Sequence, residues 1–191
     1  PTGTVLDREK LLAILAATAG KSIVVVDEAY IEFCPQFSMV DLIQQYPNLV
    51  ITRTLSKGFA LAGLRCGFTL ANAEVISLLL KVIAPYPIPE PVAQIAAQAL
   101  SGAGLEKMRQ RVAWLNGLKA EFKAELQRQP CVKEVFEEHG NFLLARFASG
   151  SRLFQAMVDQ GIILRDFGNK PMLEECVRIT IGDEAEMAEV I

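Results

Sequence analysis

The chain contains, at residues 23–30, the run Ile23-Val24-Val25-Val26-Asp27-Glu28-Ala29-Tyr30. Its first half is apolar and mostly β-branched, which is typical of a parallel strand buried on both faces. A second run, Leu49-Val50-Ile51-Thr52-Arg53, leads into Thr54-Leu55-Ser56-Lys57-Gly58. Both predicted strands therefore end in polar side chains. Because ligands of open parallel sheets bind at the carboxyl ends of strands, these two ends are the first candidates for a site.

Helical patterns alternate with the predicted strands. Asp7 is a suitable N-cap for a first helix that Gly20 closes, and a helical stretch is predicted near residues 39–45. A third strand is predicted at residues 66–70, followed by a helix over residues 73–82. This alternation predicts an α/β fold with a mostly parallel sheet covered on both faces.

The pattern changes after a proline-rich stretch, which is expected to break regular structure at Pro85, Pro87, Pro89 and Pro91. Helices are predicted over residues 91–100 and 105–129, with Gly102-Ala103-Gly104 as a linker between them. The remainder predicts a small α+β domain, with strands at 132–136, 142–147, 162–164 and 177–181 and a helix at 151–160. We place the domain boundary between residues 104 and 105.

Composition excludes several classes of function. Of the 191 residues, 51% are hydrophobic and 21% are charged, and the net charge of −3 argues against binding nucleic acid or anionic membrane by bulk charge. No signal peptide is visible, and the absence of an initiator methionine suggests a chain cut from something longer. His139 is the only histidine, which excludes multi-histidine metal sites. Four widely spaced cysteines fit buried, reduced thiols in a cytoplasmic protein: Cys34, Cys66, Cys131 and Cys176.

Several reactive groups are predicted to share the cleft at the two strand ends. They are the carboxylate of Asp27, the phenol of Tyr30, the hydroxyls of Thr54 and Ser56, the amine of Lys57 and the guanidinium of Arg65. Each alone has an ordinary structural explanation, such as a cap, a core aromatic or a solvated charge. Together they match the needs of pyridoxal 5′-phosphate: an amine for an imine, an anion at the pyridine nitrogen, and hydroxyl and cationic groups at the phosphate.

The segments Asp27–Tyr30 and Thr54–Gly67 resemble the core of the fold-type I aminotransferases. Three further segments resemble the histidinol-phosphate aminotransferase family more narrowly: Ala84-Pro85-Tyr86-Pro87, Gly161-Ile162-Ile163-Leu164-Arg165-Asp166 and Val177-Arg178-Ile179-Thr180-Ile181-Gly182. The resemblance covers residues 1–191 and is to the C-terminal half of that family. It implies that residues 1–104 belong to a cofactor-binding large domain and that residues 105–191 form a connecting helix and a small C-terminal domain.

The resemblance also implies roles for individual residues. Lys57 would hold the cofactor covalently and then move the substrate proton, while Asp27 would pair with the pyridine nitrogen and Tyr30 with the phenolate oxygen. Thr54, Ser56 and Arg65 would bind the cofactor phosphate. In the small domain, Arg178 would bind the carboxylate of glutamate, and Arg165 would lie near the substrate phosphate, because a guanidinium binds two oxygens at once.

The implied reaction is a transamination of histidine biosynthesis, in which glutamate leaves as 2-oxoglutarate and imidazole-acetol phosphate becomes histidinol phosphate. A homodimer is expected. From the residues alone, Asp27 and Lys57 would serve a decarboxylase equally well, so a threonine-phosphate decarboxylase stays an alternative. A second alternative is a non-catalytic remnant that acts as a dimerisation module.

Parts of the family pattern are missing from the sequence. The chain starts at Pro1-Thr2-Gly3, directly after the family's cofactor-binding asparagine, and it stops at Ile191 inside an expected helix. The glycine-rich phosphate turn, the ring-stacking aromatic and the first strands are also absent. We therefore expect an inactive chain with an exposed sheet edge and exposed apolar surface, which is poorly stable or pairs with a second copy.

Overall fold

The structure is a computed structural model that describes residues 2–137 and 139–190. The chain divides into two compact units. One consists of Val5–Arg111, and the other consists of Val112–Ile191 together with Pro1–Thr4. The predicted boundary after residue 104 lies inside a continuous helix, α4 (Gly102–Leu126), whose residues are shared between the two units.

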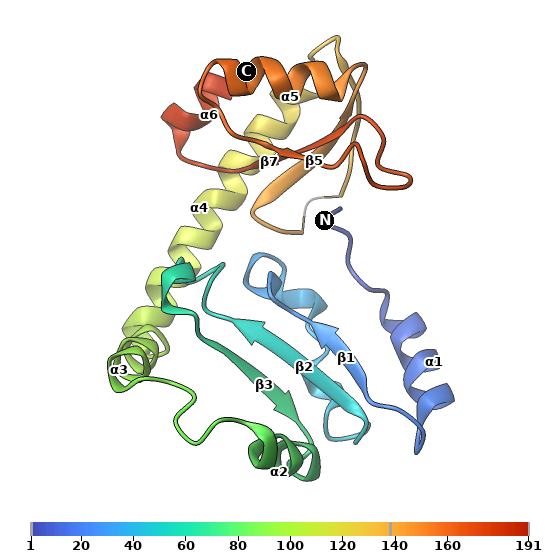
Figure 1. Cartoon of the computed structure of the whole chain (residues 1–191), viewed down its shortest axis with the longest axis vertical. Helices are drawn as coiled ribbons and strands as arrows, with labels where there is room; N and C mark the ends of the chain where they lie inside the picture. Colours follow the sequence, from blue (N-terminus) through green and yellow to red (C-terminus); the bar gives the residue numbers. More distant parts are fainter. Residues whose placement is uncertain (1, 138, 191) are drawn as a thin grey trace. The chain divides into compact units, whose positions relative to one another are not determined.

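The unit Val5–Arg111 contains a three-stranded sheet in the order β1-β2-β3, formed by β1 (Val24–Asp27), β2 (Leu49–Thr54) and β3 (Gly67–Ala71). Figure 1 shows the three strands side by side. β1 and β2 are parallel, with Val24 opposite Leu49 and Asp27 opposite Thr52. β2 and β3 are antiparallel, so the sheet is mixed rather than mostly parallel. The segment between β2 and β3 contains only the 3₁₀ turn η4 (Ala62–Leu64), and no crossover helix returns the chain for a parallel pairing.

Helix α1 (Arg8–Thr18) packs against one face of this sheet. Asp7 caps it as predicted, since its Oδ1 accepts a hydrogen bond from the Lys10 amide at 2.9 Å. Leu11 and Leu15 are completely buried in a cluster that also contains Leu49 and Ile51 of β2. The apolar face of α1 therefore forms part of the hydrophobic core of this unit, together with β2.

The opposite face of β1 is exposed. Val25 retains 60% of its accessible surface, whereas Val24 and Val26 pack against the α1 cluster. The prediction that this strand is buried on both faces is therefore wrong for the chain as described, because only one layer of described residues covers it. Helix α2 (Ala73–Val82) also exposes large apolar side chains, including Leu78, Leu80 and Val82. The expected apolar surface is thus present.

Residues 39–45, predicted as a helix, form instead the short 3₁₀ turn η3 (Val40–Leu42). Two similar turns precede it, η1 (Ile31–Phe33) and η2 (Pro35–Phe37). The Met39 amide at the start of this segment donates to the Glu28 carboxylate at 2.7 Å. At its other end, Pro47 disfavours helical backbone at the residue before it, which limits how far the turn can extend.

Helix α3 (Glu90–Ala99) follows the proline-rich stretch, and α4 begins almost at once after it. The predicted linker Gly102-Ala103-Gly104 is wrong, because these residues form the first turn of α4. Ser101 caps this turn: its Oγ accepts a hydrogen bond from the Gly104 amide at 3.3 Å. A Cβ at position 104 would lie 2.3 Å from the carbonyl oxygen of Ala99, so glycine permits the close approach of the two helices.

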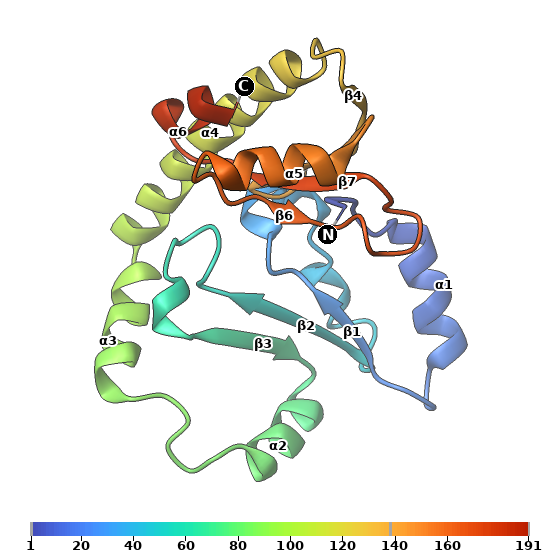
Figure 2. The same cartoon turned by 45° about the horizontal axis from the view of Figure 1, so that its top comes forward.

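The other unit contains a four-stranded antiparallel sheet in the order β4-β5-β7-β6, and Figure 2 gives a second view of it. Its strands are β4 (Val132–Val135), β5 (Phe142–Phe147), β6 (Arg165–Asp166) and β7 (Cys176–Thr180). The strand predicted at residues 162–164 thus occurs slightly later. Helices α5 (Gly150–Asp159) and α6 (Glu184–Val190) contribute to a core centred on Leu143, Ala145, Val177 and Ile179. This arrangement fits the predicted α+β class.

All four cysteines carry free thiols. Cys34, Cys66 and Cys176 are buried as expected, whereas Cys131 is exposed, contrary to expectation. Burial raises the pKa of the Cys176 thiol. Over residues 2–137 and 139–190, none of the helices combines the length and the apolar character needed to cross a membrane.

We predict that Gly104→Ala destabilises the chain by about 1–3 kcal/mol, because the new methyl group overlaps the Ala99 carbonyl. Gly117→Ala is the matched control on the same helix, since nothing lies within 4 Å of a Cβ there. The control should gain about 0.5–1 kcal/mol from its lower backbone entropy. Urea unfolding of both variants measures the difference, and equal stabilities would contradict the close approach.

Candidate functional site

The carboxyl ends of β1 and β2 lie next to each other because the two strands are parallel. Asp27 is the last residue of β1, and its carboxylate is exposed. Its Oδ1 accepts a hydrogen bond from the Ala29 amide at 2.9 Å, which turns the chain toward Tyr30. The acid predicted to face the cofactor therefore also shapes the turn that carries the phenol.

Lys57 and Tyr30 come together at this end of the sheet. The Lys57 Nζ lies 5.2 Å from the centroid of the Tyr30 ring, over its face. The two residues belong to different turns, one after each strand, so only the strand pairing brings them close. A cation over an aromatic ring at this distance is favourable. The sequence predicted both residues for one cleft, and the structure places them near each other, whereas their roles toward a cofactor stay predictions.

The two predicted hydroxyls are also neighbours. Thr54 Oγ1 and Ser56 Oγ are 2.9 Å apart, and the Ser56 amide donates to Thr54 Oγ1 at 3.1 Å. Arg65 has a left-handed backbone, with φ of 53°, and its Nη1 donates to the Ala62 carbonyl at 3.1 Å. Its guanidinium is otherwise exposed. The two hydroxyls are thus hydrogen-bonded to each other, whereas the hydrogen bond of Arg65 goes to a carbonyl three residues earlier in the chain.

An ion pair that was not predicted from the sequence links the two strand ends. Glu28, which is only 5% exposed, accepts hydrogen bonds from Arg53 Nε at 3.0 Å and Arg53 Nη2 at 2.8 Å. The Ser38 hydroxyl and the Met39 amide also donate to this carboxylate. The sequence does contain a signal for this ion pair. A charged residue directly follows one predicted strand, and an arginine lies inside the next. The buried carboxylate is satisfied by these donors, as burial of a charge requires.

A second carboxyl group, that of Glu32, packs against the turn that carries Lys57. A Cβ at Gly58 would lie 2.6 Å from Glu32 Cβ, so the residue after Lys57 has to be glycine for the two segments to pack this way. Glu32 Oε2 is buried and has no hydrogen-bond partner within the described chain. Burial raises the pKa of this carboxyl, because the charged form loses its hydration. An unsatisfied acceptor therefore lies against the backbone of the candidate site.

The two arginines predicted to bind substrate lie in the other unit. Arg165 of β6 is directly opposite Arg178 of β7 in the antiparallel register. The centroid of the Phe167 ring lies 5.7 Å from Arg165 Cζ and 5.6 Å from Arg178 Cζ. Arg178 Nε is buried without a partner in the part of the chain that is described. Like charges opposite each other on a sheet are unfavourable, so the register places two guanidinium groups where they repel each other.

The predicted residues thus fall into two sets. Asp27, Tyr30, Thr54, Ser56, Lys57 and Arg65 all belong to the unit Val5–Arg111, at or after the ends of β1 and β2. Arg165 and Arg178 belong to the other unit, on paired strands. Within residues 2–137 and 139–190, no group of histidine, cysteine and carboxylate side chains is suited to hold a metal ion. The site chemistry therefore resides in an amine, a phenol, hydroxyls, an exposed carboxylate and guanidinium groups.

This fold and this set of side chains define an α/β protein of the aminotransferase type. The sequence matches the family described as "Aminotransferase class I and II" over residues 1–191. The chain belongs to this family.

Its curated relatives include the histidinol-phosphate aminotransferases of Aeromonas hydrophila subsp. hydrophila, at 62% identity, and of Aeromonas salmonicida, at 60%. Both matches cover 100% of this chain and 54% of the relative. The histidinol-phosphate aminotransferase of Yersinia pestis is 57% identical, over 50% of its length. The chain thus spans about half the length of the curated relatives it matches, and its placement in their C-terminal half stays a prediction.

Solved structures share the fold. The histidinol-phosphate aminotransferase from Clostridium acetobutylicum superposes with a TM-score of 0.90 at 29% identity, over 99% of this chain and 58% of that one. The L-threonine-O-3-phosphate decarboxylase from Porphyromonas gingivalis reaches a TM-score of 0.82 at 23% identity, over 98% of this chain and 58% of that one. The second likeness concerns the fold alone, and the predicted α/β class is confirmed.

We predict that Arg53→Ala destabilises the chain by about 3 kcal/mol, because it leaves the buried Glu28 carboxylate without its cationic partner. The control is Arg8→Ala, which removes the exposed ion pair with Asp41 and should cost far less, because solvent screens an exposed pair. Chemical unfolding at neutral pH measures both. Equal losses would show that Glu28 does not depend on Arg53.

Proposed function

We propose that the protein carrying this chain is a pyridoxal-phosphate-dependent aminotransferase that exchanges an amino group between glutamate and imidazole-acetol phosphate. The products would be 2-oxoglutarate and histidinol phosphate. The observation that carries the proposal is the Lys57 amine, 5.2 Å from the Tyr30 ring at the adjoining ends of two parallel strands. The identity of 62% to a histidinol-phosphate aminotransferase supports the choice of substrate class.

The residues of the unit Val5–Arg111 fit the cofactor by the chemistry of their donors. Asp27 offers an exposed carboxylate to a protonated pyridine nitrogen, and Tyr30 offers a hydroxyl to the phenolate oxygen. The Thr54 and Ser56 hydroxyls and the exposed Arg65 guanidinium are suited to a phosphate group. A solved histidinol-phosphate aminotransferase from Sinorhizobium meliloti, which shares this fold at 24% identity, is in complex with pyridoxal-5′-phosphate.

When bound, the cofactor would act as the electron sink that stabilises negative charge at the substrate Cα. Lys57 would hold it through the ε-amine and, once released, would move the proton between the substrate Cα and the cofactor C4′, which transamination requires. Asp27 would keep the pyridine nitrogen protonated by its negative charge. Tyr30 lies under the lysine amine, where it would orient that amine.

Arg165 and Arg178 would bind the anionic groups of the substrates. Their opposed positions on β6 and β7 put two positive charges side by side, and the orphaned Nε of Arg178 is a donor that a carboxylate can satisfy. Phe142 and Phe167 hold the Arg178 guanidinium plane, at 4.7 Å and 5.6 Å from their ring centroids. We assign the glutamate carboxylate to Arg178 and the substrate phosphate to Arg165. A homodimer is part of the proposal, and the exposed apolar side chains of β1 and α2 support it.

A threonine-phosphate decarboxylase is the nearest rival, because it shares the fold and would use the same acid and lysine. The fold does not separate the two. Among the solved structures identity slightly favours the aminotransferase, at 29% against 23%, and the 62% identity to a curated histidinol-phosphate aminotransferase favours it further. Glutamate alone distinguishes them in solution. An aminotransferase converts the cofactor to its amine form with glutamate and no second substrate, which changes its absorbance, whereas a decarboxylase does not.

We predict that reduction with borohydride in the presence of pyridoxal phosphate labels Lys57, because its amine is the one that faces the site. The experiment uses this chain and a version extended to full length with the unmatched part of the Aeromonas hydrophila relative. Peptide mapping locates the label. Lys57→Ala should abolish it, whereas Lys81→Ala, on the exposed surface of α2, should leave it unchanged. Label spread over surface lysines in both proteins would refute the assignment.

We predict that Arg178→Gln in the extended protein raises KM for glutamate about 10–100-fold, the loss expected for a charged hydrogen bond. Arg165→Gln should instead raise KM for histidinol phosphate. The control is Arg152→Gln, an exposed arginine of α5, which should change neither constant. Steady-state kinetics with each substrate varied separately measures the effects. Unchanged constants in both site variants would remove the two arginines from the proposed site.

A further inference from the structure

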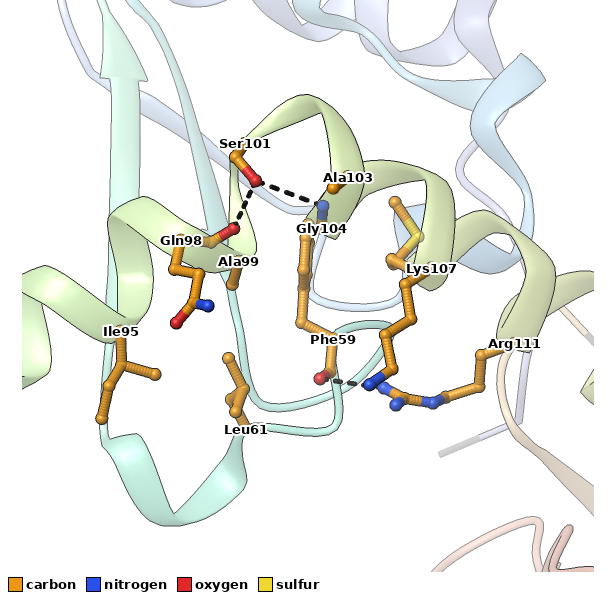
Figure 3. Close-up of a pocket in the computed structure, with 11 residues that line it drawn as sticks. Phe59, Leu61, Ile95, Gln98, Ala99, Ser101, Ala103, Gly104, Lys107 and Arg111 are labelled. Atoms are coloured by element: carbon orange, nitrogen blue, oxygen red, sulfur yellow. Dashed lines mark hydrogen bonds between the residues drawn. The ribbon is translucent and has the colours of Figure 1, made fainter.

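The unit Val5–Arg111 contains a cavity that none of the eight proposed site residues lines (Figure 3). It has a volume of about 430 Å³ and lies between the loop after Lys57 and the helices α3 and α4. This volume lies within the range of about 300–1,000 Å³ that is typical of small-molecule sites. The cavity is therefore large enough for a ligand of modest size.

One part of the cavity wall is apolar. Phe59 and Leu61 come from the loop after Lys57, Ile95 comes from α3, and Met108 comes from α4. Phe59 and Met108 also belong to a small hydrophobic cluster with Leu55 and Cys66, so this wall is part of a packed core. Ile95 is 44% exposed, although it lies on the cavity side of α3. An apolar ligand body would thus bury surface that is now accessible to water.

The other part of the wall is cationic. Lys107 and Arg111 lie one helical turn apart on α4, and Figure 3 shows both side chains reaching toward Phe59. Arg111 Nη1 donates to the Phe59 carbonyl at 3.1 Å, and no ion pair is recorded for Lys107 among the described residues. No aspartate or glutamate lines the cavity. Two like charges at this spacing repel each other on a helix, and a bound anion would relieve the repulsion.

The nearest acid on α4 is directed to a different set of partners. Glu106 accepts a hydrogen bond from the Gln110 side chain at 2.9 Å and lies 3.8 Å from Arg109. Neither Glu106 nor these two partners lines the cavity. The positive charge of Lys107 and Arg111 is therefore not neutralised by the acid closest to them in sequence.

We propose that this cavity binds a small organic anion with an apolar body, such as a carboxylate carried on an aromatic or branched chain. The ring or chain packs on Phe59, Leu61 and Met108, and the carboxylate lies between Lys107 and Arg111. The Gln98 side chain, which also lines the cavity, supplies an uncharged donor near the end of α3. This cavity shares no residue with the proposed cofactor and substrate sites, so each proposal can be tested independently of the other.

The test uses 3-phenylpropanoate as the probe and 3-phenylpropanamide as its uncharged analogue. Binding of each to the ¹⁵N-labelled chain is followed by NMR titration, with a millimolar Kd expected for a ligand of this size, about 0.3 kcal/mol per heavy atom. The anion should shift the amide signals of Phe59, Leu61 and Met108. The amide analogue should bind at least about fivefold more weakly, because it loses the charge-assisted contact.

Lys107→Gln is the informative variant, because Lys107 is exposed and its loss leaves the Arg111–Phe59 hydrogen bond intact. It should weaken binding of the anion about fivefold or more and leave binding of the amide analogue unchanged. Arg109→Gln is the matched control: it removes a cation of the same helix that does not line the cavity. Equal affinities for anion and amide, an equal effect of the two variants, or shifts confined to the exposed surface of α2 would each overturn the proposal.

Discussion

One buried carboxylate determines the geometry of the candidate site. Glu28 follows β1, its amide donates to the Thr52 carbonyl of β2 at 2.9 Å, and its side chain binds Arg53 of the same strand. The turn that carries Tyr30 starts from Glu28, and the turn that carries Lys57 starts shortly after Arg53. Because both turns begin at the same ion pair, the phenol and the amine are brought to one end of the sheet. A carboxylate buried to this extent is destabilised if it moves away from its donors, so it fixes the positions of the two turns. Its burial also costs free energy, because the charge loses its hydration.

The sequence predicted those parts of the fold that depend on local pattern. Asp7 precedes the first helix and caps it, the helix predicted over residues 73–82 is present, and the runs around Val25 and Val50 each form a strand. Among the predictions that failed, two show how structure depends on more than the local pattern. The direction of β3 depends on which way the chain returns after Lys57, and hydrophobicity carries no information about that direction. Gly102–Gly104 suggests a flexible linker, yet Gly104 is needed because the Ala99 carbonyl would contact any side chain there.

The candidate site was predictable to the extent that its residues follow buried strands. Residue type and position sufficed to place Asp27, Tyr30 and Lys57 at adjoining strand ends. The Glu28–Arg53 pair was missed, because an acid directly after Asp27 suggests only a polar turn. Its burial depends on contacts with another segment, such as that of Ser38. The opposed positions of Arg165 and Arg178 could not be predicted from the sequence either, because they result from the register between β6 and β7.

Some unsatisfied and strained groups lie at the proposed sites, whereas others, such as the left-handed Met172 and Glu175, do not belong to them. Buried side-chain atoms without a partner, in the described part of the chain, include Oε2 of Glu32 beside Gly58 and Nε of Arg178, which lies opposite Arg165. Arg65 adopts a left-handed backbone, and Arg165 and Arg178 oppose each other despite their like charge. A left-handed backbone at a non-glycine residue, a buried polar atom without a partner and like charges opposite each other are each unfavourable taken alone. Unfavourable local features of this kind are expected at functional sites, where interactions with a bound group compensate for their free-energy cost. Their position at both proposed sites therefore supports a binding role independently of the motif.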